Sequence, residues 1–368
     1  MEIYLSPPHL TGEELTLLAQ TLQKGWIAPA GDNLTLFEEK IKQYIGKKYA
    51  LAVNSGTSAM HLAVKALGIS KNDFVLCQSL TFVASLNPIL YEQAIPVLID
   101  SEPETWNLSP KYLEQAIEYC LKAGKKPKAI VVVHLYGRPA MMKEITEIAT
   151  FFGIPIIEDA AESLGAGYRE KKVGNFGELA FFSFNGNKII TTSAGGMLVS
   201  NEEKYISKAQ FWATQAKDPA PHYQHSEVGY NYRMSNVLAA LGLAQMDVLE
   251  QRIAQKRHIF EQYQKALAHI PYIHFPQAIP YIQETHWLTR ILFDTPAQAQ
   301  KALQTLHAHR IEARPLWKPM HLQPLYQNCM YFGESIAQHL FERGLCLPSG
   351  TQLTNQQINQ ICEIITKR

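Results

Sequence analysis

Charge of either sign is scarce in this sequence, and like charges do not gather into runs. Its 34 Lys and Arg residues nearly balance its 33 Asp and Glu residues, so the formal net charge is +1. Without a basic patch or tail, neither nucleic acid nor an anionic membrane is an expected partner. No apolar run is long enough to cross a bilayer, and the first residues lack the basic and apolar regions of a signal peptide. We therefore expect a cytoplasmic protein.

Cysteine is also sparse, and its spacing argues against two common uses. The sequence contains five cysteines, which is an odd number. They are widely spread and include no Cys-x-x-Cys pair. This pattern disfavours a disulfide framework or a zinc site and favours a reducing compartment. No pair of histidines has metal-ligand spacing, so we expect no metal. The residues expected to serve as small apolar fillers are Cys77, Cys120, Cys329, Cys346 and Cys362.

Short apolar runs alternate with helical patterns in the first part of the chain. Several runs are continuously apolar, which is typical of strands buried on both faces of a mostly parallel sheet. The pattern predicts an α/β layered domain. The strand candidates are residues 49–53, 74–77, 96–100, 129–133, 154–157, 180–184 and 196–199, and the helix candidates include residues 58–67, 110–123 and 141–152.

A length of 368 residues suggests two domains rather than one. Residues 237–268 have the pattern of one long helix, which we interpret as a connector leading out of the first domain. Shorter mixed elements follow, and a final helix is expected near residues 355–366. We therefore expect a large domain at residues 1–250 and a smaller α+β C-terminal domain at residues 251–368.

Ligands of parallel α/β sheets bind beyond the carboxyl ends of the strands, so polar residues there are candidates for a site. The first strand leads into Asn54-Ser55-Gly56-Thr57-Ser58 at the start of a helix. Small residues at a helix N-terminus suit a phosphate, although an ordinary Ser or Thr cap has the same appearance. The segment is neither a Walker motif nor a Gly-x-Gly-x-x-Gly fingerprint, so a dinucleotide-binding oxidoreductase is poorly supported.

Two more strand ends carry ionisable residues. Glu158 and Asp159 could act as metal ligands, as an acid/base pair, as partners of a buried cation, or as solvated loop acids. Asp159 beside a pyridine nitrogen would keep that nitrogen protonated. Lys188 lies between an apolar strand and two isoleucines, and burial would make its amine a nucleophile toward a carbonyl. Ser183 is close enough in sequence to bind a phosphate on the same ligand. His134 also ends a strand, where either a structural or a catalytic role fits the sequence.

Together these segments resemble the sugar-nucleotide aminotransferases of the DegT/DnrJ/EryC1/StrS family, a branch of the fold-type I pyridoxal 5′-phosphate (PLP) enzymes. The resemblance covers essentially the whole chain. It implies a fold-type I PLP-dependent transferase with a mostly parallel central sheet in the large domain. The motifs that carry it are Asn54-Ser55-Gly56-Thr57-Ser58-Ala59, Thr81-Phe82, His134-Leu135-Tyr136-Gly137, Glu158-Asp159-Ala160-Ala161-Glu162, Ser183-Phe184-Asn185-Gly186-Asn187-Lys188 and Gly229-Tyr230-Asn231-Tyr232-Arg233-Met234-Ser235.

The resemblance implies a role for each matching position. Lys188 would hold PLP as a Schiff base and then move the proton between cofactor and substrate carbons. Asp159 would pair with the pyridinium nitrogen and make the ring an electron sink, while Phe82 would stack on the ring. Asn231 would reach the phosphate from the neighbouring subunit, which implies a homodimer with shared active sites. The phosphate would otherwise be held by Gly56, Thr57, Ser58 and Ser183.

One position departs from the family pattern. Glu162 stands near the expected phenolic oxygen of the cofactor, where relatives often have Gln or His. A carboxylate facing a phenolate needs a proton or a different orientation. Some relatives are dehydratases with His at the lysine position, so Lys188 favours transamination.

Within the family the chain is most similar to the bacillosamine-type branch, which acts on UDP-4-keto-6-deoxy-N-acetylhexosamines. The motifs for this are Leu5-Ser6-Pro7-Pro8-His9, Ile27-Ala28-Pro29, residues 183–192, residues 312–318, Met320-His321 and Leu347-Pro348-Ser349-Gly350-Thr351. Arg233 and Arg314 are candidates for binding the amino donor's carboxylates or the substrate's diphosphate. The resemblance also implies that two segments lie along the nucleotide-sugar site. Core packing would explain their two tryptophans equally well. The segments consist of Gly25, Trp26, Ile27, Ala28, Pro315, Leu316, Trp317 and Lys318.

The predicted reaction moves an amino group from L-glutamate to C4 of the UDP-ketosugar, yielding 2-oxoglutarate and a UDP-4-amino-4,6-dideoxy sugar for bacterial glycan synthesis. One alternative is the same chemistry at C3 or on a GDP- or dTDP-linked ketosugar. Another is a PLP-dependent sugar dehydratase or lyase. A third is a PLP-binding regulator, although the chain carries no added DNA-binding module or basic face.

Overall fold

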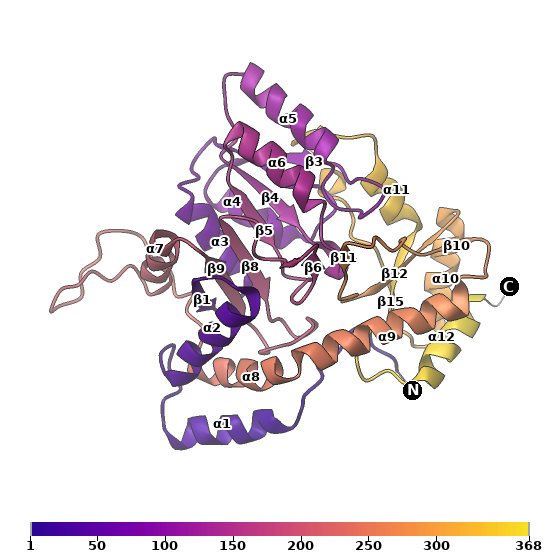
Figure 1. The fold of residues 1–368 in the computed structure, drawn as a ribbon, viewed down its shortest axis with the longest axis horizontal. Coiled ribbons are helices and arrows are strands. Elements are labelled where there is room, and N and C mark those ends of the chain that lie inside the picture. Colours follow the sequence, from indigo (N-terminus) through magenta and orange to yellow (C-terminus); the bar gives the residue numbers. More distant parts are fainter. Residues whose placement is uncertain (1, 367–368) are drawn as a thin grey trace.

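One large mixed sheet forms the centre of the computed structural model, which describes residues 2–366 (Figure 1). Its strands are β1 (Tyr49–Val53), β2 (Phe74–Gln78), β3 (Ile95–Ile99), β4 (Ala129–Val133), β5 (Ile156–Asp159), β8 (Leu179–Ser183), β9 (Gly196–Ser200) and β14 (Met330–Phe332). Within the described residues these eight strands have the order β1-β9-β8-β5-β4-β2-β3-β14. All neighbours from β8 to β14 are parallel, whereas β9 is antiparallel to both of its neighbours. The predicted α/β fold with a mostly parallel sheet is confirmed.

Helices bury the large sheet on both faces, which explains its continuously apolar strands. Along β2, Val75 and Cys77 pack into the cluster that contains residues of α3 and α7, while Leu76 packs on the opposite face with residues of α5 and α6. The helices around this sheet are α1 (Glu13–Gln23), α2 (Asp32–Ile45), α3 (Gly56–Ala66), α4 (Asn87–Tyr91), α5 (Pro110–Lys122), α6 (Met142–Phe152) and α7 (Glu203–Ala213), with 3₁₀ turns at Val83–Ser85, Leu135–Gly137 and Met320–Leu322.

The expected single helix over residues 237–268 is two helices. These are α8 (Asn236–Asp247) and α9 (Leu249–Leu267), and Val248 between them leaves helical geometry with φ −111° and ψ 7°. The apolar spacing continues across Val248, so the sequence pattern did not reveal the break. In Figure 1, α8 lies against α1 and α2, and α9 leads toward the C-terminal elements.

A second, antiparallel sheet forms the core of the C-terminal part. Its strands are β10 (Ile273–His274), β12 (Thr289–Phe293), β13 (Arg314–Pro315) and β15 (Gly344–Leu347), in the order β10-β12-β15-β13. The helices here are α9, α10 (Pro296–Ala308), α11 (Ile336–Arg343) and α12 (Asn355–Thr366). A small sheet of β6 (Gly167–Tyr168), β7 (Lys171–Lys172) and β11 (Ile282–Gln283) ties the two parts together.

Two segments cross the expected boundary at residue 250. β14 returns from the C-terminal part to pair with β3 at the edge of the large sheet. Ile3, near the N-terminus, pairs with Ile311 of the C-terminal part. We retain residues 1–250 and 251–368 as the proposed domains, with these two segments exchanged between them.

Residues 214–231 form a long hairpin after α7 that projects from the body of the molecule at the left of Figure 1. Lys217 pairs with His225 inside it, and Tyr223 near its tip is 83% exposed.

None of the helices in residues 2–366 has the length and apolar character required to cross a membrane.

Candidate active site

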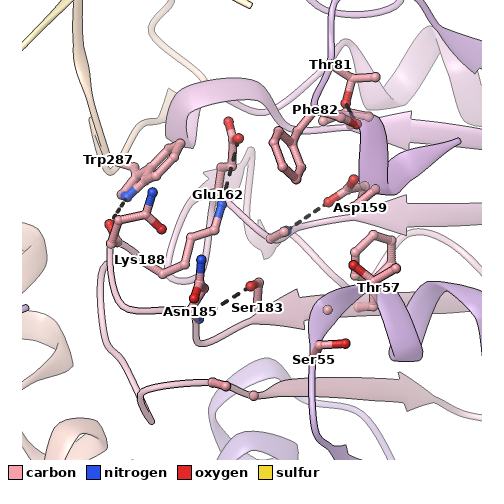
Figure 2. Close-up of a pocket in the computed structure, with 18 of the residues that line it drawn as sticks. Ser55, Thr57, Thr81, Phe82, Asp159, Glu162, Ser183, Asn185, Lys188 and Trp287 are labelled. Carbon is pink, nitrogen blue, oxygen red and sulfur yellow. Dashed lines mark hydrogen bonds and ion pairs between the residues drawn. The ribbon is translucent and has the colours of Figure 1, made fainter. Parts of the chain in front are cut away.

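The predicted strand-end residues meet in one pocket of about 300 Å³ (Figure 2). Asp159 ends β5 and Ser183 ends β8, while Gly56 begins the helix that follows β1. These strands run in the same direction, so their carboxyl ends lie at one edge of the sheet. Trp287 and Trp317 of the C-terminal part close the pocket from the other side.

Lys188 lies inside this pocket, with its side chain 12% exposed. Its Nζ is 3.8 Å from Oε1 of Glu162 and 4.1 Å from the centre of the Trp287 ring. Burial lowers the pKa of the Lys188 ammonium, against the opposing effect of the Glu162 and Asp159 carboxylates. A larger fraction of the amine is therefore neutral, and nucleophilic, than in an exposed lysine.

Asp159 is a buried carboxylate held by two donors. Ser85 Oγ donates to its Oδ2 over 2.5 Å, and the Ala161 N–H donates to its Oδ1 over 3.1 Å. Thr81 in turn bonds the Ser85 hydroxyl over 2.7 Å. Burial raises the pKa of Asp159, so a cation placed beside it would be strongly favoured.

Glu158, the neighbouring carboxylate, points into a different environment. It is fully buried and accepts hydrogen bonds from three backbone N–H groups of residues 174–177 and from His134 Nε2 at 3.1 Å. Burial alone would raise the pKa of Glu158, but these hydrogen bonds hold it below the usual value. His134 Nδ1 accepts from the Ala140 N–H over 3.1 Å, which places the ring proton on Nε2. Neither residue lines the pocket, so Glu158 is not a loop acid and both side chains are structural.

The start of α3 forms the opposite end of the pocket. Ser55 caps the helix by accepting from the Ser58 N–H over 3.0 Å, and the Ser58 hydroxyl donates to Asn54 Oδ1 over 2.6 Å. The N–H groups of Gly56 and Thr57 lie in the first helical turn, where no helical partner exists for them. A Cβ at Gly56 would come within 3.0 Å of Ser183, so only glycine fits there without a shift. Gly56, Thr57 and Ser183 line the pocket, and Ser58 does not.

Aromatic rings and Glu162 form the remaining wall. Phe82 is 55% exposed despite its size, and its ring centre lies 6.1 Å from that of Trp317. Glu162 accepts from the Tyr136 N–H over 2.8 Å and from Trp317 Nε1 over 3.3 Å. Burial raises the pKa of Glu162, with Lys188 as the main opposing influence.

Several predicted site residues lie outside this pocket. Arg233 is engaged internally, because its Nη1 donates to Glu38 and to the Ala52 carbonyl at 2.9 Å. Arg314 is exposed and pairs with Glu312 at 2.9 Å. Residues 25–28 and Asn231 are exposed and absent from the pocket wall.

The predicted residues 315–318 are divided between three environments. Pro315 is exposed, Leu316 is buried, and Trp317 lines the pocket. Lys318 lines an adjoining hollow of about 520 Å³, which shares Thr81, Phe82 and Trp317 with the pocket.

Sequence reasoning missed several residues of the pocket wall, above all Trp287. It lies about a hundred positions from Lys188 and stands in no motif that links the two. The Thr81-Phe82 pair was part of a recognised motif, but the pairing of Thr81 with Ser85 beneath Asp159 depends on the fold. Asn185 and Asn187 also line the pocket. Their closeness to Lys188 in the sequence was the signal that could have identified them as pocket residues.

The model described as the DegT/DnrJ/EryC1/StrS aminotransferase family matches residues 8–366. The chain belongs to this family. It is 48% identical over 368 residues to EpsN of Bacillus subtilis (strain 168), which carries the provisional name of a pyridoxal phosphate-dependent aminotransferase, and the match covers 99% of this chain and 95% of EpsN. It is 39% identical over 360 residues to the GDP-perosamine synthase of Escherichia coli O157:H7, covering 98% of this chain and 96% of that one.

A solved structure gives the same assignment. The DegT DnrJ EryC1 StrS aminotransferase from Brucella abortus has a TM-score of 0.89 and 26% identity to this chain, covering 96% of it and 94% of the other. The protein is therefore a PLP-dependent sugar aminotransferase of the fold-type I class.

The pocket residues fit this cofactor. Among residues 2–366, Asp159 offers a buried carboxylate with no ion pair within 4.0 Å, and the start of α3 offers N–H groups without a helical partner to a phosphate. Phe82 presents an exposed ring face, and Lys188 is the buried amine. Across residues 2–366, no group of His, Cys, Asp or Glu side chains is arranged to hold a metal ion.

Proposed function

We propose that this aminotransferase moves an amino group from L-glutamate to C4 of a UDP-4-keto-6-deoxy-N-acetylhexosamine. The observation that carries the reaction type is the buried Lys188 amine, placed between the Glu162 carboxylate and the Trp287 ring in a pocket that suits PLP. The sugar rests on the sequence resemblance to the bacillosamine-type branch. Glycan synthesis in the cytoplasm is the proposed setting.

Each pocket residue then has a distinct task. When bound, PLP supplies an electron sink for the carbon atom that loses its proton. Lys188 would take that proton on Nζ and return it to the neighbouring carbon, which requires an amine that is neutral for part of the cycle. Asp159 would keep the ring nitrogen protonated. Glu162, 3.8 Å from Lys188 Nζ, would stabilise the ammonium while Lys188 carries the proton.

The nucleotide-sugar would extend from the pocket into the adjoining hollow. That hollow is mostly apolar and includes Lys318, Leu325 and Tyr326 beside the shared Phe82 and Trp317. Lys318 supplies a cation near a diphosphate. Arg314 remains a candidate for the same anion, whereas the internal bonds of Arg233 favour a structural role.

The substrate assignment can be tested through the absorbance of the purified enzyme loaded with PLP. We expect L-glutamate to bleach the band of the lysine-bound cofactor and UDP-4-keto-6-deoxy-N-acetylglucosamine to restore it. Bleaching without restoration by this sugar would retain the reaction type and reject the sugar. Release of ammonia without a keto acid would instead indicate a lyase or dehydratase.

A GDP-linked ketosugar is the second candidate. Three relatives that are 35–39% identical to this chain are named GDP-perosamine synthases. Restoration of the band by a GDP-4-keto-6-deoxyhexose and not by the UDP-sugar would favour this candidate.

We further propose a homodimer in which each chain completes the other's site. Asn231 and residues 25–28 are exposed and lie outside the pocket of their own chain. Trp26 is 57% exposed and Ile27 52%, as expected for side chains that a second copy covers. Asn231 lies at the base of the projecting hairpin, where it pairs with Thr214.

Shared sites predict complementation between two impaired variants, assayed at a PLP concentration that loads the wild type but not Asn231→Ala. Asn231→Ala is expected to weaken PLP binding about tenfold or more through loss of a phosphate contact. In a mixed dimer of Asn231→Ala and Lys188→Ala chains, one site combines both defects and the other combines none. We expect mixing under exchange conditions to restore up to about a quarter of the wild-type activity, because half of the dimers are mixed. No recovery in confirmed mixed dimers would place Asn231 in the site of its own chain.

A further inference from the structure

Lys256 is a buried lysine that the proposed reaction does not use. It lies on α9 with 2% of its surface exposed. Its Nζ donates to Ser349 O over 2.8 Å, Trp287 O over 2.9 Å and Ser6 Oγ over 3.2 Å. No carboxylate forms an ion pair with it in the part of the chain that the structure describes. Three donors of one ammonium thus meet three neutral acceptors from distant segments.

Such a residue is expensive to bury. Burial, and secondarily Arg252, lowers the pKa of Lys256 to about 7. Apolar side chains fill a protein core without this loss of hydration, so a lysine here needs another explanation. The three oxygen atoms that it connects provide one.

Two of these acceptors lead to the residue before Lys188. Ser6 Oγ accepts from Lys256 and donates to the Asn187 carbonyl over 3.0 Å. Trp287, whose own carbonyl accepts from Lys256, donates from Nε1 to the same Asn187 carbonyl over 2.7 Å. The Asn187 carbonyl is therefore held by two donors, both anchored on Lys256.

The hydrogen bonds to the Asn187 carbonyl set the position of the Trp287 ring against the Lys188 amine. Figure 2 shows the indole of Trp287 beside the Lys188 side chain, with the dashed line of its hydrogen bond at the lower edge of the ring. Lys188 Nζ lies 4.1 Å from the ring centre, within the range of a cation–π interaction. An indole face stabilises the ammonium form of the lysine and not the neutral amine.

We propose that Lys256 is a positioning residue for the aminotransferase reaction. Its hydrogen bonds to Ser6 and Trp287 fix the two donors of the Asn187 carbonyl and hold the Trp287 ring against Lys188. This inference rests on the proposed role of Lys188. Lys256 itself does not line the pocket.

The test uses Lys256→Met, which keeps an unbranched side chain of similar length and removes all three donors. In the PLP-loaded enzyme, we expect kcat of the glutamate half-reaction to fall about tenfold with little change in KM, since loss of geometry at the reacting groups affects turnover. In the cofactor-free protein, the pKa of Lys188 should fall as the ring moves away from the ammonium. The pH dependence of covalent labelling at Lys188, mapped by peptide mass spectrometry, measures that pKa.

Two further variants separate positioning from packing. Lys265→Met removes an exposed lysine from the same helix and should leave both readouts unchanged. Trp287→Leu should lower the Lys188 pKa by itself, and adding Lys256→Met to it should lower the pKa little further. Equal effects of Lys256→Met in both backgrounds, or a loss of thermal stability with no change in pKa and kcat, would overturn the proposal.

Ser6→Ala covers the case in which Lys256→Met does not fold. It removes one of the two donors to the Asn187 carbonyl without altering a helix. We expect a smaller shift of the Lys188 pKa in the same direction, and no shift would count against the proposal. Labelling needs neither cofactor nor sugar, so a wrong sugar assignment would leave these results interpretable. Failure of glutamate to bleach the wild-type enzyme would instead reject the proposed function.

Discussion

Replacing Lys188 by alanine is expected to lower transamination by at least about 10⁴-fold, because one amine both holds the cofactor and moves the proton. Within residues 2–366, no second lysine lines the pocket. Glu162 and Asp159 are the charged neighbours of Lys188, and both are buried acids that other donors already hold. Turnover of L-glutamate by the purified variant, supplied with excess PLP, measures the loss.

A surface variant and an added amine make this result specific. Lys204→Ala removes an exposed lysine from α7 and should retain full activity. Methylamine should restore part of the activity of Lys188→Ala, since a free base can occupy the space that the lysine leaves. If Lys188→Ala retained more than a few per cent of the wild-type turnover, the assignment of the proton-transfer group would be wrong.

Some pocket residues could be predicted from the sequence, because ligands of parallel α/β sheets bind at the carboxyl ends of the strands. Asp159 and Ser183 end parallel strands, and Gly56 starts the helix after a third, so their common edge could be inferred before any coordinates existed. Strands such as β1 and β4 were predicted at their observed bounds, because continuous apolar runs between turns are a strong local signal.

The parts that could not be predicted depend on contacts between distant segments. Nothing local marks Met330–Phe332 as a strand of the large sheet, because its partner β3 lies far away in the sequence. Trp287 reads as an ordinary core tryptophan until the fold places it over Lys188. Arg233 is the opposite case. Its place in a family motif suggested a ligand contact, whereas in the structure its Nη1 donates to Glu38 and to the Ala52 carbonyl.

The adjacent acids Glu158 and Asp159 provide the second large expected effect, since neighbouring substitutions should fail in different ways. Asp159→Asn keeps the shape of the side chain, and its amide can donate to Ser85 Oγ instead of accepting from it, but it removes the charge that holds a proton on the ring nitrogen. We expect kcat to fall about 10³-fold at unchanged thermal stability. The absorbance maximum of the bound cofactor should also shift, because it responds to protonation of the ring.

Glu158→Gln should do the opposite and destabilise the fold by about 3 kcal/mol at pH 7, since its amide would face backbone donors in a fully buried site. The pKa of Glu158 is lower in the folded protein than its ordinary value of 4.5, so its stabilising effect is complete above that value and is lost as the pH falls through the folded-state pKa. Urea unfolding of the wild type and of Glu158→Gln should therefore show a difference in unfolding free energy that becomes smaller at acidic pH. A stable but inactive Glu158→Gln, or an unstable Asp159→Asn with normal turnover per folded molecule, would reverse the two assignments, because only the carboxylate that faces the pocket can act on the cofactor.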